Sequence, residues 1–511
     1  MKHKNFYITT PIYYPSGEPH MGHAYSSILA DVFARFKRID NHKVHFLTGT
    51  DEHGLKIQKA AEKNNLDPLD YCNKISKIFE DLAKKLNLSN NDFIRTTEKR
   101  HYKSVNDIWN RLIKSGDIYL SKYKGWYSVS DEAYYNSDEI IEKNGKNFST
   151  FSGSSVEWVE EDSFFFKLSA WQEKLLKFYD ENEKFILPIS RRNEVINFVK
   201  SGLKDLSVSR TSFTWGIKVP KNEKHVIYVW LDALTNYLSA LNFPNTNDNL
   251  YKDFWPASLH VIGKDILRFH AIYWPAFLLA ANIKPPIRIF SHGWILSGEN
   301  KMSKSRGNIL NPLEIIKTYG IDELRYYLMK EVPHGSDGNV SLKNLESCIN
   351  SDLANNYGNL CQRIFSFIKN NCDNKVTQRK NISISDKKLI KQTKELTSGL
   401  RNEMDNQNLN NYIKSVVNIS FLTNKYINDE EPWNLKKSNL EKMNNILHIS
   451  LEQIAKISIL LSPIIPDKTS KVLDALNINN DLRNLAFFDG EDVLHKDIRL
   501  NNLDILFKKI T

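Results

Sequence analysis

The feature that most constrains the fold is an alternation of apolar, strand-like runs with helical patterns. Phe6–Thr10 reads as a buried strand, and the apolar residues of 28–39 then recur at helical spacing. Val44–Leu47 is a second strand-like run, and a further helical pattern follows it. Strands that alternate with helices are typical of a parallel α/β sheet. The later runs Leu259–Ile262 and Ile287–Phe290 fit the same sheet.

Two regions depart from this alternation. Residues 120–169 are turn-rich, acidic and aromatic, which indicates a small inserted unit. From about Leu345 onward, apolar residues recur at three- and four-residue spacing, which predicts a helical bundle after the α/β domain. The expected domains are the first half of the α/β domain at 1–117, the insertion at 118–222, the second half of the α/β domain at 223–344 and the helical bundle at 345–511.

Composition narrows the setting. The chain has 511 residues and a formal net charge of +10, which favours a polyanionic partner, although an evenly solubilising surface would give the same excess. Its four cysteines form no CxxC pair, which suits reduced thiols. No run reaches the length of roughly 18–20 apolar residues that a membrane span needs, and no signal peptide is evident. We therefore expect a soluble, cytoplasmic protein with no membrane partner.

The sharpest local feature is His20-Met21-Gly22-His23, at the expected start of the first helix. A helix N-terminus attracts phosphate through its N–H groups and its partial positive charge. Gly22 would let a nucleotide approach the backbone, and both imidazoles can donate hydrogen bonds to phosphate oxygens. The alternative is a surface helix start with chance histidines, and these four residues alone leave the two readings even.

A second feature is the basic run Lys301-Met302-Ser303-Lys304-Ser305, flanked by glycines and polar residues that predict a loop. A closing loop can bring two lysines over a triphosphate and stabilise charge mainly in the transition state. Taken alone, an exposed basic loop is the better interpretation. No GxxxxGK[ST] and no GxGxxG occurs, so the commoner phosphate-binding loops do not compete.

Together, these two runs resemble the HxGH and KMSKS signatures of the class I aminoacyl-tRNA synthetases, in the order and at the strand ends seen in that family. A narrower resemblance to the methionyl-tRNA synthetases covers most of the first 345 residues and continues more loosely beyond them. It rests on Thr9–His20, on Thr48–Gly54, on Val229–Ala233 with Tyr237, and on Gly263–His270. The resemblance implies a Rossmann-like catalytic domain with a connective insertion, followed by an all-α anticodon-binding bundle.

The resemblance also implies a ligase that activates methionine with ATP and transfers it to initiator and elongator tRNA. Lys301 and Lys304 would act with His20 and His23 in catalysis. ATP, as its Mg²⁺ complex, would meet His20, Gly22, His23, Asp265 and Lys304. The implied methionine pocket comprises Ile12, Tyr14, Asp51, Trp230, Ala233, Tyr237, Ile266 and His270. A soft aromatic wall suits a thioether, and a carboxylate suits the substrate's ammonium group. For each aromatic residue alone, core packing is the usual alternative.

The insertion departs from the pattern of many family members, which place cysteine zinc ligands there. Residues 118–170 contain neither cysteine nor histidine, whereas a structural zinc site needs four ligands. We therefore predict a knuckle without zinc, as in the zinc-free branch of the family that Tyr127–Glu132 resembles. The insertion is also too short for the editing domain of the isoleucine, valine and leucine enzymes, whose pockets discriminate one methylene by only ~1–3 kcal/mol.

In the helical part, the resemblance implies that four residues read the anticodon: Asn355, Asn359, Arg363 and Trp433. Three of them lie four residues apart, which places them on one helix face, and amide, guanidinium and indole groups suit unpaired bases. Solvated polar residues and a core tryptophan are the alternative. We expect a monomer that binds tRNA and no DNA. Competing functions are another class I synthetase, a small nucleotidyltransferase and a non-catalytic tRNA-binding relative.

Overall fold

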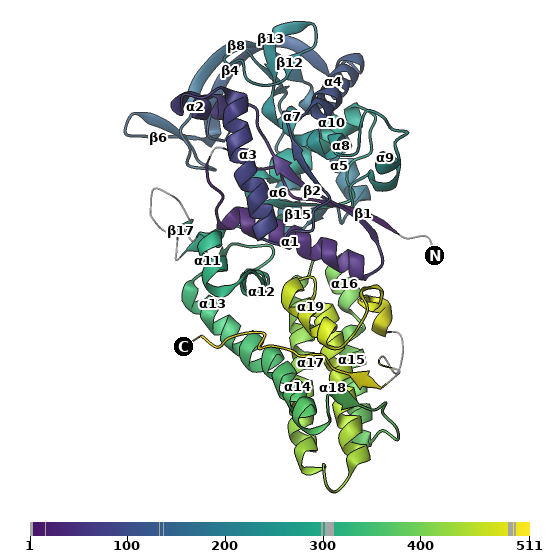
Figure 1. Cartoon of the computed structure of the whole chain (residues 1–511). Helices are drawn as coiled ribbons and strands as arrows, with labels where there is room; N and C mark the ends of the chain where they lie inside the picture. Colours follow the sequence, from purple (N-terminus) through teal and green to yellow (C-terminus); the bar gives the residue numbers. More distant parts are fainter. Residues whose placement is uncertain are drawn as a thin grey trace. The chain divides into compact units, whose positions relative to one another are not determined.

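A six-stranded sheet forms the centre of the α/β part (Figure 1). The computed structural model describes residues 4–15, 17–131, 133–135, 137–297, 300–301, 311–488, 494 and 497–510. The strand order is β3-β2-β1-β14-β15-β9, and the pairs β2–β3, β1–β14, β14–β15 and β15–β9 are parallel. The strands are β1 (Asn5–Thr9), β2 (Lys43–Thr50), β3 (Asp92–Arg95), β9 (Ile186–Leu187), β14 (Leu259–Gly263) and β15 (Ile289–His292). The predicted parallel α/β fold is confirmed.

The chain divides into two compact units, each with its own packing. One comprises 5–19 and 45–292 and contains the sheet and the insertion; the other comprises 1–4, 20–44 and 293–511. The helices of the sheet unit are α2 (Leu55–Lys63), α3 (Pro68–Lys85), α4 (Lys99–Lys114), α5 (Gln172–Glu181), α6 (Ile189–Lys200), α7 (Val229–Leu234), α8 (Asn236–Ser239), α9 (Asn249–Phe254) and α10 (Trp274–Ala280), with the short helices η2 (Leu168–Trp171), η3 (Lys264–Ile266) and η4 (Phe269–Tyr273).

The inserted region is built on a long antiparallel pair, β4 (Ile118–Ser128) and β8 (Glu157–Phe166). Trp126 and Trp158 face each other edge-on across this pair, with ring centroids 5.3 Å apart. Cross-strand aromatic pairs of this kind stabilise a ribbon that has little core of its own. The smaller elements of the region are β5 (Ala133–Tyr135), η1 (Ser137–Glu139), β6 (Ile140–Lys143), β7 (Lys146–Ser149), β10 (Leu206–Ser207), β11 (Ser209–Arg210), β12 (Lys218–Val219) and β13 (Asn222–Ile227).

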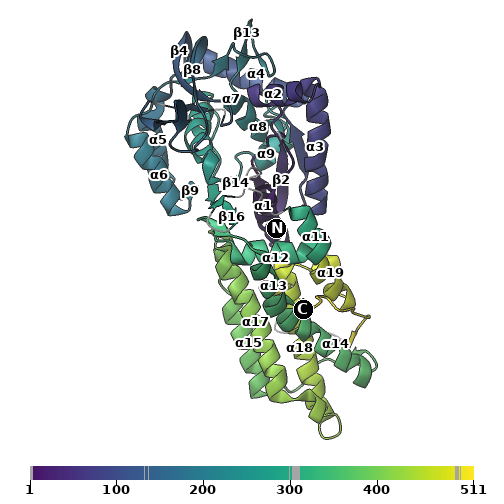
Figure 2. The ribbon, with the colours of Figure 1, turned by 90° about the vertical axis from the view of Figure 1, so that its left-hand side faces the viewer.

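The second unit is helical almost throughout, as predicted from residue 345 onward, and α15, α17 and α18 run side by side in it (Figure 2). Its helices are α1 (Met21–Ile39), α11 (Pro312–Tyr319), α12 (Ile321–Glu331), α13 (Leu342–Cys348), η6 (Ile349–Gly358), α14 (Asn359–Asn371), α15 (Ile384–Thr397), α16 (Leu400–Asp405), α17 (Leu409–Glu430), η7 (Pro432–Asn434), α18 (Leu440–Leu461), α19 (Pro466–Ala475), η8 (Asn480–Leu482) and η9 (Leu485–Phe488). Its short strands are β16 (Ile295–Ser297), β17 (Asn300–Lys301), β18 (Gly338–Asn339), β19 (Lys375–Val376) and β20 (Ile498–Arg499). None of the described helices could span a membrane.

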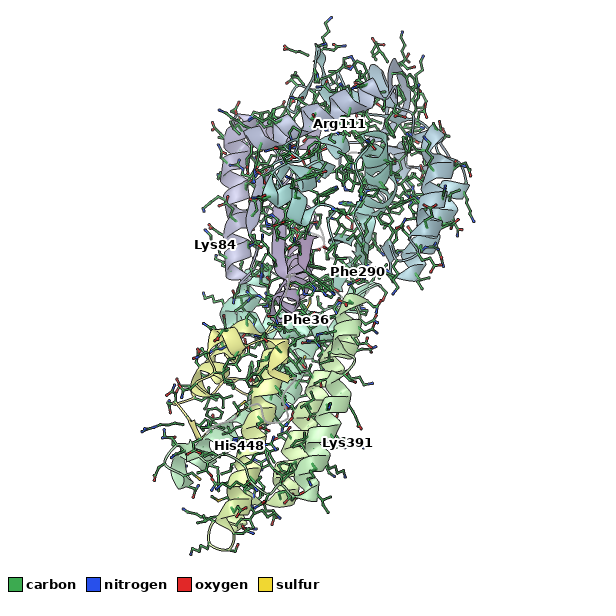
Figure 3. All side chains as sticks on the ribbon, turned by 90° about the vertical axis from the view of Figure 1, so that its right-hand side faces the viewer. Phe36, Lys84, Arg111, Phe290, Lys391 and His448 are labelled. Carbon is green, nitrogen blue, oxygen red and sulfur yellow. The ribbon has the colours of Figure 1, made fainter. Side chains whose placement is uncertain are left out.

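Helix α1 is anchored within this helical unit by a buried ion pair. The guanidinium of Arg325 on α12 lies 2.6 Å from the Asp31 carboxylate on α1, and both side chains are fully buried. Arg325 also donates to the carbonyls of Pro463 and Ile464, so a charge that would be costly alone is matched on several sides. Phe36, labelled in Figure 3, packs edge-on against Tyr412 at 5.5 Å. The start of α1 is therefore carried by a firmly packed helix.

Candidate functional site

The run His20-Met21-Gly22-His23 forms the N-terminal cap of α1. His20 is the capping residue, and its Nδ1 accepts a hydrogen bond from the backbone N–H of Gly22 at 3.1 Å. Nδ1 of His23 accepts from the backbone N–H of His20, also at 3.1 Å, and the two rings stack with centroids 3.9 Å apart. A side chain at position 22 would place its Cβ 2.9 Å from the His20 ring, so the ring would have to shift from its capping position. Two imidazoles thus replace the usual Ser and Glu of a capping box.

This cap fixes where each imidazole carries its proton. A nitrogen that accepts from a backbone N–H cannot itself hold hydrogen, so the neutral rings of both His20 and His23 carry the proton on Nε2. Both rings therefore carry an Nε2–H group near the positive end of the helix dipole. The sequence indicated phosphate chemistry here, and the cap supplies donors of the type that phosphate oxygens accept.

The residues expected around methionine come from the loops after three neighbouring strands, β1, β2 and β14, and from α7 and α8. The loop after β1 is tied to the end of β2, because the Tyr13 N–H donates to the Gly49 carbonyl and the Asp51 N–H donates to the Tyr13 carbonyl, both at 2.9 Å. Ile12 and Tyr14 flank this bridge, and Asp51 is buried. The carboxyl ends of adjacent parallel strands thus bring Ile12, Tyr14 and Asp51 together, as ligand sites of such sheets require.

Tyr237 and His270 form a buried hydrogen-bonded pair. The Tyr237 hydroxyl lies 2.8 Å from His270 Nε2, and His270 Nδ1 lies 3.0 Å from the Ile266 carbonyl. Because a carbonyl only accepts, Nδ1 holds the proton and Nε2 accepts from the tyrosine. Burial lowers the pKa of His270 to about 4, so the ring is neutral near pH 7. The Tyr237 hydrogen is thereby directed at His270, and burial raises the pKa of its hydroxyl further above the usual value.

A flat aromatic wall adjoins this pair. Trp230 stacks face to face on Phe269, with centroids 3.7 Å apart and planes 4° from parallel, and lies edge-on to His270 at 6.2 Å. Ala233 lies one turn after Trp230 on α7, and Ile266 packs on the same core. Among the described residues, the buried Trp230 Nε1 has no hydrogen-bond partner. Such a wall offers polarisable contact and little hydrogen bonding, which suits a thioether better than a hydroxyl.

Two residues in this region carry geometry that the sequence did not indicate. Phe269 is the stacking partner of Trp230, and His260 lies 4.2 Å from the Tyr237 ring, measured between centroids. His260 Nδ1 also lies 2.8 Å from the Thr9 hydroxyl. His260 lies on β14, whereas Phe269 and His270 lie on η4. The helix η4 is a π-helix, a rare form that is enriched at functional sites. No local pattern of the sequence distinguishes these aromatics from core residues.

Of the remaining residues expected to contact ATP, Asp265 is fully described, Lys301 only in its backbone, and Lys304 not at all. Asp265 is exposed in η3, directly after β14, and its carboxylate folds over Gly263, where a Cβ would meet it at 2.6 Å. The backbone of Lys301 belongs to β17, which pairs with β16. Its side chain and the whole of Lys304 lie outside the described residues.

The knuckle in the insertion is organised around one carboxylate. The half-buried Asp131 accepts hydrogen bonds from three hydroxyls, those of Tyr135 at 2.7 Å, Ser152 at 2.5 Å and Ser154 at 2.8 Å. A carboxylate with three donors joins separate turns much as a metal joins its ligands. Across the described ranges, no three His, Cys, Asp or Glu residues are grouped as metal ligands.

The helical unit brings two of the four anticodon candidates together. The guanidinium of Arg363 on α14 lies over the Trp433 ring at 5.8 Å and donates to the Asn428 side-chain oxygen at 2.8 Å. Trp433 is 42% exposed, which is uncommon for so large an apolar ring and argues against a core role. Asn359 is half-buried at the first position of α14. Asn355 is exposed in η6, a second π-helix. Asn428 was not predicted; it orients Arg363 from α17.

Comparisons with known proteins match nearly the whole chain. A family model described as class I tRNA synthetases (M) matches residues 6–365. A model of the anticodon binding domain of methionyl tRNA ligase matches residues 376–511. Over 509 residues the chain is 49% identical to the methionine–tRNA ligase of Rickettsia typhi, covering 99% of each chain. It is 47% identical over 487 residues to that of Brucella suis, covering 95% of this chain and 94% of the relative.

Solved structures give the same result. The methionyl-tRNA synthetase of Mycobacterium tuberculosis in complex with methionyl-adenylate is 42% identical, with a TM-score of 0.96 and 99% of each chain covered. The apo form of the Mycobacterium tuberculosis enzyme is 39% identical, with a TM-score of 0.89 over 100% of this chain and 99% of that one. Sequence identity of 39–49% over nearly the full length shows membership of one family and not only a shared fold.

We predict that the knuckle is independent of zinc and depends on Asp131. A chelator that removes zinc should leave the melting temperature unchanged, whereas Asp131→Ala should strand three hydroxyls and loosen residues 137–156. Amide hydrogen exchange in this segment is the measurement. Glu160→Ala, which removes an exposed ion pair with Lys124, is the control and should leave exchange unchanged. Stoichiometric zinc in the purified protein, or melting at lower temperature with chelator, would contradict the prediction.

Proposed function

The chain belongs to the methionyl-tRNA synthetases of class I, and from this premise we propose how its residues perform the reaction. As a methionine–tRNA ligase, it joins methionine to tRNA with ATP. The methionine carboxylate attacks the α-phosphorus of ATP, and pyrophosphate leaves. The terminal ribose hydroxyl of tRNA then attacks the adenylate carbonyl, AMP leaves, and an ester is formed. Neither step needs a covalent nucleophile from the protein, so catalysis consists of positioning and charge stabilisation.

The observation that supports the methionine assignment is a series of hydrogen bonds from Tyr237 through His270 to the Ile266 carbonyl. This series lies beside the Trp230–Phe269 stack. Tyr237 commits its hydrogen to His270, so its oxygen can meet the substrate sulfur only as a weakly polar surface. The stacked rings supply the polarisable wall that a thioether prefers. Asp51, buried at the end of β2, would accept from the substrate ammonium group, and Ile12, Tyr14, Ala233 and Ile266 would complete the apolar enclosure.

For ATP, we propose that His20 and His23 donate their Nε2–H groups to phosphate oxygens and that Gly22 leaves room for the phosphates. Lys301 and Lys304 would stabilise the charge that passes to pyrophosphate, and Asp265 would contact the ribose. ATP would enter as its Mg²⁺ complex, which neutralises part of the triphosphate charge.

For tRNA, we propose that Asn355, Asn359 and Arg363 bind the edges of anticodon bases and that Trp433 stacks on one of them. The position of Trp433 supports this role. Arg363 lies over the indole ring, and the part of the ring that is exposed to solvent is available for a base to stack on. We further propose the functional domains as 1–117 with 223–344, 118–222 and 345–511. In this proposal the enzyme is a cytoplasmic monomer without structural zinc that charges initiator and elongator tRNA alike.

The roles of the two His20 nitrogens can be separated by substitution. His20→Asn keeps an acceptor near Nδ1 and remains a good helix cap, but it removes the Nε2 donor. We expect unchanged melting and a loss of roughly 100–1000-fold in the turnover of methionine-dependent ATP–pyrophosphate exchange, the size of one lost transition-state donor. His20→Gln restores a donor near Nε2 but loses the cap, so it should retain more activity at lower stability. Equal activity in both variants would contradict the assignment.

The anticodon assignment predicts a split between the two half-reactions. Trp433→Ala should leave pyrophosphate exchange intact and lower kcat/KM for tRNA charging by roughly 5–150-fold, since stacking on one base contributes ~1–3 kcal/mol. Lys304→Ala should instead lower exchange and charging together. Ile384→Ala, which truncates an equally apolar and even more exposed side chain of the same unit, is the control and should change neither reaction. Unchanged charging in Trp433→Ala would refute the role, for initiator and elongator transcripts assayed separately.

A further inference from the structure

A fully buried carboxylate lies next to the residues of the proposed methionine pocket. Asp232 is on α7, between Trp230 and Ala233, and none of its surface is exposed. One carboxylate oxygen lies 2.7 Å from His53 Nδ1, and the other lies 2.6 Å from His101 Nε2. Burial opposes ionisation of Asp232, but the two imidazoles overcome it and hold the pKa of the carboxyl at about 2. The Asp232 carboxyl is therefore ionised near neutral pH.

The hydrogen bonds continue beyond each imidazole. His101 Nδ1 lies 2.9 Å from the Ser239 hydroxyl, and His53 Nε2 lies 3.2 Å from the Tyr102 hydroxyl. Because an ionised carboxylate only accepts, both histidines must donate to Asp232. This fixes the proton on Nδ1 of His53 and on Nε2 of His101. The outer nitrogens lie against the two hydroxyls, and that of Ser239 also donates to the Thr235 carbonyl at 3.0 Å, so five side chains form one network.

The network joins the segments that carry the pocket. His53 stands two residues after Asp51, Asp232 lies between Trp230 and Ala233, and Ser239 follows Tyr237 by two residues on α8. These segments come from separate parts of the chain, since His53 and Asp232 are 179 residues apart. Helix α4 contributes His101 and Tyr102 as the common support. One carboxylate thus links the segment that follows Asp51 with α4 and, through His101 and Ser239, with α8.

We propose that Asp232 is a positioning residue for methionine, and that with His53 and His101 it sets the distance between Asp51 and the wall formed by Trp230 and Tyr237. Both carboxylate oxygens of Asp232 are engaged by imidazoles, so Asp232 would act through His53 and His101 and not on the substrate directly. Two short, directed hydrogen bonds restrict sliding in a way that apolar packing does not. Displacement of Asp51 relative to the wall would weaken binding of the amino acid's ammonium group and thioether at once. Binding of ATP would be affected much less.

The first test is Asp232→Asn, which keeps the shape and removes one of the two acceptors. We expect the KM for methionine in pyrophosphate exchange to rise about tenfold or more, with the KM for ATP and the kcat at saturating methionine changing less than about threefold. Asp117→Asn is the matched control, because Asp117 accepts from Trp171 Nε1 at 2.9 Å in the same unit but far along the chain from the pocket residues. It should leave both KM values unchanged.

A second pair of variants keeps the proposal decidable if Asp232→Asn does not fold. His53→Asn places an amide N–H near the position of Nδ1 and can still donate to Asp232, whereas His53→Gln places it near Nε2 and cannot. We expect the Asn variant to retain a methionine KM within about threefold of the parent and the Gln variant to lose about tenfold. A purely structural role would lower the melting temperature of both variants without this order in the methionine KM.

The inference rests on the proposed methionine pocket, and the two can fail separately. A parent enzyme that shows no exchange with methionine would overturn the proposed function itself. A parent that is active, combined with variants whose KM values for methionine and ATP rise together or do not change, would overturn only the positioning role of Asp232.

Discussion

The candidate site depends on one constraint, the common direction of the strands in the central sheet. Because β1, β2 and β14 are neighbours and their carboxyl ends lie at one edge, residues near positions 12, 51 and 266 are placed at that edge despite their separation in sequence. The short helices α7 and α8 then add Trp230, Ala233 and Tyr237. Loops at such an edge are free to vary in chemistry while the strands below them hold their spacing.

In five histidines, a partner that can only accept or only donate determines which ring nitrogen carries the hydrogen. The Ile266 carbonyl fixes the proton of His270, the Asp232 carboxylate fixes those of His53 and His101, and backbone N–H groups fix those of His20 and His23. In each case the partner defines which ring nitrogen carries hydrogen and which direction that ring presents. Fixed dipoles of this kind need no reorganisation when a substrate arrives, which is the main source of electrostatic catalysis.

The sequence was sufficient for features encoded locally. Alternating apolar runs predicted the parallel sheet, three- and four-residue spacing predicted the bundle, and short motifs identified His20, Gly22 and His23 at a helix start. Features that depend on distant pairs were not predictable in this way. His53 and Asp232 meet across 179 residues, and nothing near His101 marks it as a partner of either. The ion pair of Asp31 on α1 with Arg325 on α12 could not be predicted either, because the two residues are far apart in the sequence.

The measurement that tests this account most directly is amino-acid-dependent exchange of pyrophosphate into ATP, run without tRNA for each of the twenty amino acids. We predict exchange with methionine alone, because in the proposed pocket an unbranched thioether would suit the Tyr237–His270 pair and the Trp230–Phe269 stack. Exchange with a different amino acid would contradict the pocket while retaining the class of enzyme. The absence of exchange with all twenty, in a folded sample with Mg²⁺, would contradict the catalytic assignment itself.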